Sequence, residues 1–199
     1  LKLGQEFADK MAIVQCSEPD KESLGWRVST QTDLESDWFI WWCQELKLAP
    51  IAHRKLWEYA WILQELHAAN LLDNGGRGVG FGCGEEPLPS YLAARGLELL
   101  VTDLAPDREE SKVWREVGQH GTSLASMFDE KIVSRKFFES RVSHRYVDMN
   151  DIASDIRGYD FCWSVCALEH LGSVESGLKF IENSISTLRP GGLALHTTE

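Results

Sequence analysis

The feature that most constrains the fold is a glycine-rich run that stands between an apolar strand and a helix. Residues 78–87 are Gly-Val-Gly-Phe-Gly-Cys-Gly-Glu-Glu-Pro, and the pattern around them predicts a short strand over 78–81 and a helix over 88–95. Glycine is needed where the backbone takes a positive φ or lies very close to a ligand. The run therefore predicts either a ligand-binding turn or a tight turn without a ligand.

Beyond this run, apolar stretches alternate with segments of helical periodicity. The further strands are predicted at 97–102, 145–147, 159–165 and 193–197, and further helices at 122–140 and from the cap Ser173 to the Pro190-Gly191-Gly192 turn. Strands that are apolar almost throughout are typical of a parallel sheet buried on both faces. Such alternation predicts an α/β fold with a mainly parallel sheet.

The first 75 residues lack this alternation. Residues 1–36 are polar and weakly periodic, and Asp37 is predicted to cap an aromatic helix that Pro50 ends. A second helix is predicted over 53–72 from its apolar stripe. We therefore expect a polar and aromatic-helical segment over 1–75, followed by the α/β domain over 76–199.

Charge and cysteine content limit the partners that the chain can have. The formal net charge is −11 over 199 residues, which disfavours nucleic acid because its binding needs clustered Lys and Arg. No run of apolar residues approaches the roughly 20 that cross a bilayer, and the five cysteines show no spacing typical of zinc ligands. We expect a cytoplasmic protein with a small-molecule substrate, no nucleic acid, no membrane insertion and no metal; a homo-oligomer is left open.

The spacing and charge of the glycine run indicate which ligand it can hold. A dinucleotide-binding loop needs G-x-G-x-x-G, and the third glycine is replaced by Cys83 in one frame and by Glu85 in the other. Glu85 and Glu86 would also repel a phosphate at the start of the following helix. A cofactor that has no phosphate and carries a cationic centre is compatible with the run.

Two acids follow the predicted strands and are candidates for contact with such a cofactor. Asp103, with Leu104 after it, ends the second strand, where an acid can accept hydrogen bonds from ribose hydroxyls. Asp148 could accept from an adenine amino group while Met149 packs on the ring. The alternatives are that Asp103 is a loop or capping residue and that Asp148 or Asn150 caps the next turn.

The strand over 159–165 brings a third group to the same edge of the sheet. Ligands bind beyond the carboxyl ends of strands in open α/β sheets, and Ser164 and Val165 end this strand. Glu169 is then a candidate for substrate contact, and His170 is a candidate general base. Alternatively, Glu169 only tethers neighbouring loops and His170 fills a gap in the wall.

Taken together, these motifs resemble those of class I S-adenosylmethionine-dependent methyltransferases, and the resemblance covers roughly residues 76–199. It implies a three-layer Rossmann-like sandwich that binds S-adenosylmethionine and stops after its fifth strand. The residues that match the family's cofactor motifs are Gly80, Phe81, Gly82, Cys83, Gly84, Asp103, Leu104, Asp148, Met149, Ser164 and Val165. The Leu188-Arg189-Pro190-Gly191-Gly192 segment is similar to the turn that precedes the family's fifth strand.

The chain departs from the family pattern in three places. The usual acid of the first motif is replaced by Gly80 and its last glycine by Glu86. The segment between Asp103 and Asp148 is longer than the family core needs, so that His120 could reach the substrate as part of a lid, or lie on a solvated insertion. The family's sixth and seventh strands are missing, and we expect the natural protein to continue.

The resemblance implies methyl transfer to a small-molecule acceptor, with a saccharide or a lipid-linked metabolite as candidate acceptors. Two alternatives stay open at the level of sequence. One is a non-catalytic protein that binds S-adenosylmethionine or acts as a scaffold. The other is a nicotinamide-dependent oxidoreductase, which the glycine spacing and the acids at 85 and 86 disfavour.

Overall fold

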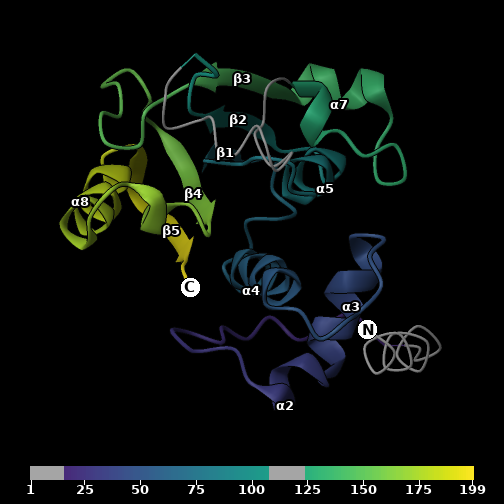
Figure 1. Ribbon diagram of the computed structural model, residues 1–199. Helices are drawn as coiled ribbons and strands as arrows, with labels where there is room; N and C mark the ends of the chain where they lie inside the picture. The colour runs from purple at the N-terminus through teal and green to yellow at the C-terminus, as the bar shows by residue number, and fades with distance from the viewer. Residues whose placement is uncertain (1–15, 108–123) are drawn as a thin grey trace. The chain divides into compact units, whose positions relative to one another are not determined.

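A computed structural model describes residues 16–107 and 124–199 of the chain. These residues belong to two compact units, and the boundary between them in the sequence falls after Leu72 (Figure 1). None of the helices in the described ranges combines the length and the apolar character that crossing a membrane requires.

The first unit contains the helical segment that the sequence predicted. Its helices are α2 (Gln31–Leu34), α3 (Asp37–Glu45) and α4 (Arg54–Ala68). The predicted cap of α3 is off by one residue, because the Ser36 hydroxyl accepts the bond from the Phe39 amide and Asp37 is the first helical residue. A carboxylate in the first turn still favours the helix dipole.

Helices α3 and α4 pack through aromatic and aliphatic side chains. The indole of Trp42 is fully buried and donates to Gln64 Oε1 at 2.8 Å. Gln64 in turn donates to the carbonyls of Asp20 and Glu22, both at 2.9 Å. The extended residues before α2 are thus fastened to α4 by polar groups that would otherwise be buried without partners.

The second unit is built on a parallel sheet of five strands, which confirms the predicted fold class. The strands are β1 (Arg77–Phe81), β2 (Glu98–Asp103), β3 (Val142–Tyr146), β4 (Tyr159–Val165) and β5 (Leu188–Thr197). Their order is β3-β2-β1-β4-β5, and every pair is parallel. The order reverses between β1 and β4, so the carboxyl ends of these two strands form the crevice where such sheets bind ligands.

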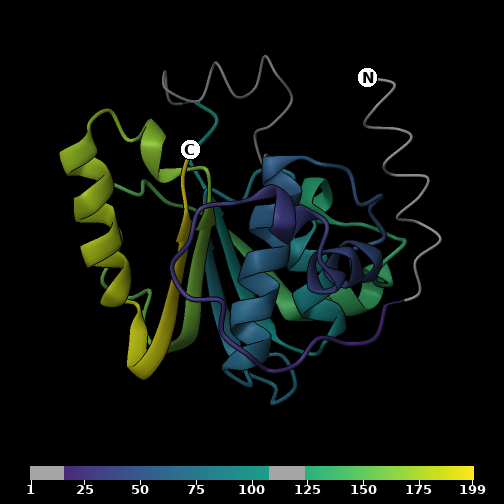
Figure 2. The ribbon, with the colours of Figure 1, turned by 90° about the horizontal axis from the view of Figure 1, so that it is seen from below.

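Helices cover both faces of this sheet, as the predicted three-layer sandwich requires (Figures 1 and 2). Helix α5 (Leu88–Ala94) joins β1 to β2 and lies beside α7 (Arg135–Arg141), while α8 (Val174–Ile185) joins β4 to β5. The two crossovers run in opposite directions along the sheet. Because parallel crossovers are right-handed, α5 and α8 lie on opposite faces.

The centre of the sheet is buried and mostly apolar. All seven residues of β4 are buried, and Phe81 packs edge to face on Phe180 of α8 with ring centroids 5.4 Å apart. Val79, Cys162 and Met149 belong to the same cluster. This cluster joins β1 and β4 to α8 in the core of the unit.

Two predictions around the third strand are wrong. The expected helix over 122–140 is only a 3₁₀ turn, η2 (Leu124–Met127), followed by the short helix α7. The expected strand over 145–147 begins earlier, since Val142 pairs with Leu99. β3 is an edge strand of the sheet and most of its side chains are exposed or half-buried, so it carries no apolar run that marks its start.

The end of α8 also differs from the prediction. The helix ends at Ile185, and Pro190-Gly191-Gly192 lies within β5, where the pairing jumps from Leu188 opposite Tyr159 to Leu193 opposite Phe161. The segment is a bulge in an edge strand, where a missing proline N–H costs no sheet hydrogen bond.

Candidate functional site

The glycine run forms a turn at the carboxyl end of β1. Gly82 has a φ of 62° and Gly84 a φ of 53°, which L-residues with side chains rarely adopt. A Cβ on Gly82 would also lie 2.8 Å from the Ala167 Cβ. The turn therefore requires glycine at both positions, as the sequence predicted.

Gly80 is a glycine for a different reason. A Cβ at this position would lie 2.4 Å from Cys83 Sγ and 2.4 Å from Cζ2 of the Trp163 indole. Phe81 and Cys83 are themselves buried. These three residues therefore pack inside the domain, and only main-chain atoms from this part of the run could meet a ligand.

Hydrogen bonds join the glycine turn to the end of β2. Thr102 Oγ1 donates to the Gly80 carbonyl at 2.8 Å, and the Cys83 amide donates to the Thr102 carbonyl at 3.1 Å. The Asp103 carboxylate accepts from the Gly84 amide at 3.2 Å and from the Leu104 amide at 2.8 Å. The structure thus brings together the two strongest sequence signals, the glycine run and the acid 19 residues after Gly84.

Asp148 and Met149 lie near the same turn but differ in exposure. Asp148 Oδ1 accepts from the Asn150 amide at 2.9 Å, the capping geometry that the sequence left open as an alternative. Met149 is 7% exposed, and its sulfur lies 3.4 Å from where a Cβ on Gly82 would be. Met149 therefore packs next to Gly82 with little exposed surface, whereas Asp148 is half-buried and caps its own turn.

Ser164 and Val165 end β4 with buried side chains. Ser164 Oγ lies 2.8 Å from Nδ1 of His196 on β5, and Nε2 of the same imidazole lies 3.0 Å from Ser184 Oγ on α8. The Ser184 hydroxyl donates to the Ile181 carbonyl at 2.7 Å. It must therefore accept from Nε2–H, which leaves Nδ1 to accept from Ser164.

His196 is thus a neutral link between α8 and β4, and burial lowers its pKa from 6.5 to about 4. The sequence analysis missed this residue because nothing near it in the chain marks a functional group. The Ser164 hydroxyl is committed to this link, so any contact of Ser164 with a ligand would come from its main chain.

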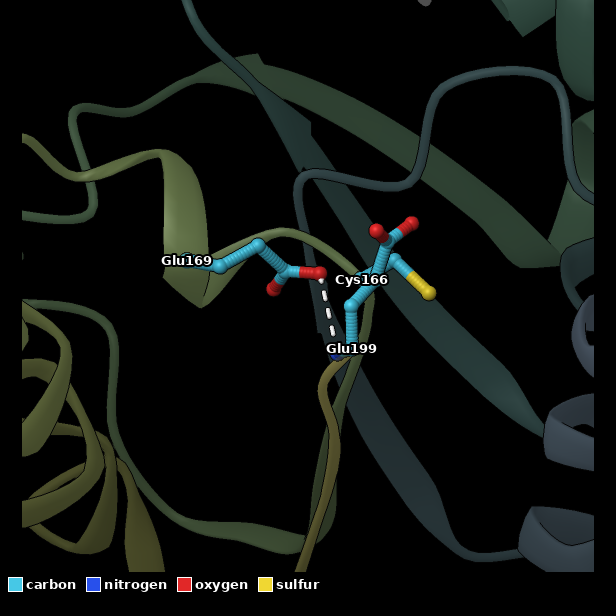
Figure 3. A group of neighbouring side chains, drawn as sticks. All are labelled: Cys166, Glu169 and Glu199. Atoms are coloured by element: carbon cyan, nitrogen blue, oxygen red, sulfur yellow. Dashed lines mark hydrogen bonds between the residues drawn. The ribbon is translucent and has the colours of Figure 1, made fainter. Parts of the chain in front are cut away.

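Glu169 and His170 lie in the 3₁₀ turn η3 (Leu168–His170) beyond the end of β4. His170 is exposed. Glu169 Oε1 accepts from the Glu199 amide at 3.4 Å, which is the tethering role left open from the sequence, while its Oε2 is buried with no hydrogen-bond partner among the described residues (Figure 3). His120 lies outside the described residues.

Glu169 belongs to a cluster of possible metal-ligating side chains that the sequence did not predict. One ligand-type atom each from Cys166, Glu169 and Glu199 lies within 4.8 Å of the others, at the carboxyl edge of β4 and β5 (Figure 3). Thiolate and carboxylate are both ligands that zinc accepts. Exposed acids commonly gather without an ion, so the distances alone assign no metal to the group.

Among the surface hollows of the described residues are one of about 380 Å³ and one of about 260 Å³. The first is lined mainly by α8 and includes Asn150, and the second lies where β1, β2 and β4 begin, next to Arg77 and Tyr159. Neither is lined by the glycine turn or by Asp103. The candidate site is therefore defined by the hydrogen-bonded turn at the carboxyl edge of the sheet.

No family model matches the chain, and no curated protein sequence matches it. Solved structures do match its fold. An S-adenosylmethionine-dependent methyltransferase from Mesorhizobium loti has a TM-score of 0.47 at 20% identity, with 70% of this chain and 53% of that chain covered.

Two further solved structures are similar in the same range. The glycopeptide N-methyltransferase MtfA, in a complex with sinefungin, has a TM-score of 0.45 at 17% identity, with 64% of this chain and 45% of that chain covered. The CcbJ methyltransferase from Streptomyces caelestis has a TM-score of 0.44 at 12% identity, with 64% of this chain and 45% of that chain covered. The chain thus spans about half the length of the structures it matches. All three are described as methyltransferases.

Proposed function

We propose that the second unit binds S-adenosylmethionine at the carboxyl edge of its sheet and transfers the methyl group to a small-molecule acceptor. The observation that carries the proposal is the bond from the Gly84 amide to the Asp103 carboxylate. It joins a positive-φ glycine turn and an acid next to the point where strand order reverses. This is where open α/β sheets bind nucleoside-containing ligands.

The residues of the turn fit this cofactor better than a phosphate-containing one. A carboxylate has about four acceptor positions, so Asp103 can receive ribose hydroxyls besides the two amides that it already accepts. The run 78–87 contains no Lys or Arg and two acids, of which Glu85 is exposed. Such a turn disfavours a pyrophosphate and tolerates a cation.

In this proposal, the main chain of Gly82 and Gly84 would face the cofactor, and Asp103 would hold its ribose. When bound, the cofactor supplies an electrophilic methyl group on a sulfonium sulfur. The protein then mainly has to align the acceptor with that methyl group, and such alignment can provide much of the rate enhancement. His170 is the candidate base for an acceptor that must lose a proton, and Glu169 is the candidate contact to the acceptor.

The acceptor we propose is a small molecule, with saccharides and lipid-linked metabolites as the classes to test first. The net charge of −11 supports a small acceptor over a nucleic acid. A cytoplasmic location and a homo-oligomer belong to the same proposal. A scaffold that binds the cofactor without catalysis would keep binding it yet methylate none of these acceptors.

Calorimetric titration with S-adenosylmethionine, S-adenosylhomocysteine and NADH tests the choice of cofactor. We expect saturable binding of the first two ligands and none of NADH. Tight binding of NADH would favour the oxidoreductase alternative, and absence of binding to all three would remove the proposal. A further titration of an Asp103→Ala variant tests the role given to this acid, because loss of a charged hydrogen bond should weaken binding by about 1–3 kcal/mol.

A further inference from the structure

A basic segment interrupts the acidic chain where helix α7 leads into the edge strand β3 (Figure 1). Residues 131–145 contain five Lys or Arg residues and one acid, so the segment has a formal charge of +4 in a chain of net charge −11. Acids resume on either side of it, at Glu130 and Asp148. None of these cations belongs to the proposed cofactor site.

Helix α7 turns its cations towards solvent. Phe138, which is only 1% exposed, holds the helix to the domain, whereas Arg135 and Lys136 are exposed. Arg141 is half-buried, and its guanidinium lies over the ring of Phe137, 5.5 Å from the ring centroid. The helix therefore presents positive charge and part of an aromatic ring on the same surface.

Acidic neighbours neutralise only part of this charge. Arg135 pairs with Glu139 at 3.6 Å and Arg145 with Asp155 at 2.7 Å, and the side chains of both pairs are well exposed, where ion pairs are weak. Lys136 is in no ion pair within the part of the chain that the structure describes. Charges beyond the Debye length of about 8 Å are largely screened at physiological salt, so this local excess of cations determines which partners the surface attracts.

Two aromatic side chains are exposed at the same place. Phe137 is 40% exposed, and Tyr146, directly after the segment, is 43% exposed. A bilayer surface of anionic lipids accepts cations together with aromatic rings, which can leave water at the boundary of the headgroups. A nucleic acid would have to stack its bases on the rings, and the Arg141 guanidinium already covers one face of Phe137. The combination therefore favours a lipid surface.

We propose that residues 131–145, with Tyr146 beside them, dock the protein on the surface of an anionic lipid bilayer. The contact stays at the surface and needs no helix that crosses the membrane. A protein held there would meet a lipid-linked acceptor, one of the two acceptor classes proposed above. The inference goes beyond the proposed function and does not depend on cofactor binding.

Co-sedimentation of the full chain with lipid vesicles tests this docking. We expect binding to phosphatidylcholine vesicles that contain about 30% phosphatidylserine, weaker binding as the salt concentration rises, and no binding to pure phosphatidylcholine. Lys136→Gln should weaken the binding roughly fivefold, and Lys136→Arg should keep it within about twofold. The matched control is Lys179→Gln, which removes an exposed lysine from α8 and should also stay within about twofold.

Phe137→Gln tests the ring separately from the charge. It should weaken vesicle binding by about threefold or more, and circular dichroism checks that each variant is folded. No preference for the anionic vesicles, or an equal loss in Lys179→Gln, overturns the inference. Tighter binding of a single-stranded RNA that Lys136→Gln weakens would assign the segment to nucleic acid instead. Vesicle binding is measured without cofactor, so it stands or fails apart from the titration with S-adenosylhomocysteine.

Discussion

Replacing His196 with glutamine tests whether its half-buried imidazole fastens helix α8 to the sheet. In the structure, His196 bonds Ser164 on β4 through Nδ1 and Ser184 on α8 through Nε2. Both bonds need the neutral tautomer that carries its proton on Nε2, because the Ser184 hydroxyl is already donated to the Ile181 carbonyl. Protonation would place a positive charge on an imidazole whose burial disfavours that charge.

The magnitude follows from the pKa of His196, which burial lowers from 6.5 to about 4. The unfolded chain binds the proton more readily than the folded one, so this contribution is fully present above pH 6.5 and is lost as the pH falls towards 4. Each pKa unit corresponds to about 1.4 kcal/mol, so the full loss is about 3 kcal/mol, of which about 2 kcal/mol falls between pH 7.5 and pH 5.

Urea unfolding measured from pH 7.5 to pH 5 checks this effect. Other groups titrate in the same range, so the quantity compared is the difference in the free energy of unfolding between the unmodified protein and His196→Gln. We expect the advantage of the unmodified protein to shrink by about 2 kcal/mol across this range. His170→Gln removes an exposed imidazole and should give a curve parallel to that of the unmodified protein. Parallel curves for His196→Gln would refute the argument.

Two further substitutions separate packing from ligand binding. Gly80→Ala should lower the free energy of unfolding by about 1–3 kcal/mol, because the added Cβ would lie 2.4 Å from atoms of Cys83 and Trp163. Thermal unfolding measures this loss. An unchanged midpoint would show that these side chains can move to make room. Ser164→Ala should cost about 1 kcal/mol of stability and leave the affinity for S-adenosylhomocysteine within about twofold, since its hydroxyl is bonded to His196. A large loss of affinity would instead place this hydroxyl at the ligand.

The sequence predicted the centre of the α/β fold more accurately than its edges. Strand β4 was predicted with its exact bounds, since it is buried along its whole length and five of its seven residues are apolar. The edge strands carry polar residues or breakers, and so β3 was placed too late and the Pro190-Gly191-Gly192 bulge of β5 was taken for the end of a helix. A proline or polar residue is tolerated there because one side of the strand has no partner in the described sheet.

The same contrast holds for the candidate site. Asp103 and Gly84 could be paired from sequence because both lie at the ends of neighbouring strands of one β-α-β unit. The hydrogen bond from Trp163 to Glu86 joins residues 77 positions apart, and the bond from Ser164 to His196 joins residues 32 positions apart. No local sequence pattern predicts which side chains will meet over such separations. The sequence therefore located the glycine turn and its link to Asp103, and it missed the polar contacts that surround them.

The measurement that tests the central claim most directly is the titration of S-adenosylhomocysteine into the unmodified protein and into Asp103→Asn. Asparagine keeps the shape of the side chain and one acceptor for the Gly84 amide, but it removes the charged acceptor for the ribose. We predict one-site binding to the unmodified protein and a loss of about 1–3 kcal/mol in the variant, or roughly 5- to 150-fold in Kd. Equal affinities, or no binding to the unmodified protein, would contradict the account.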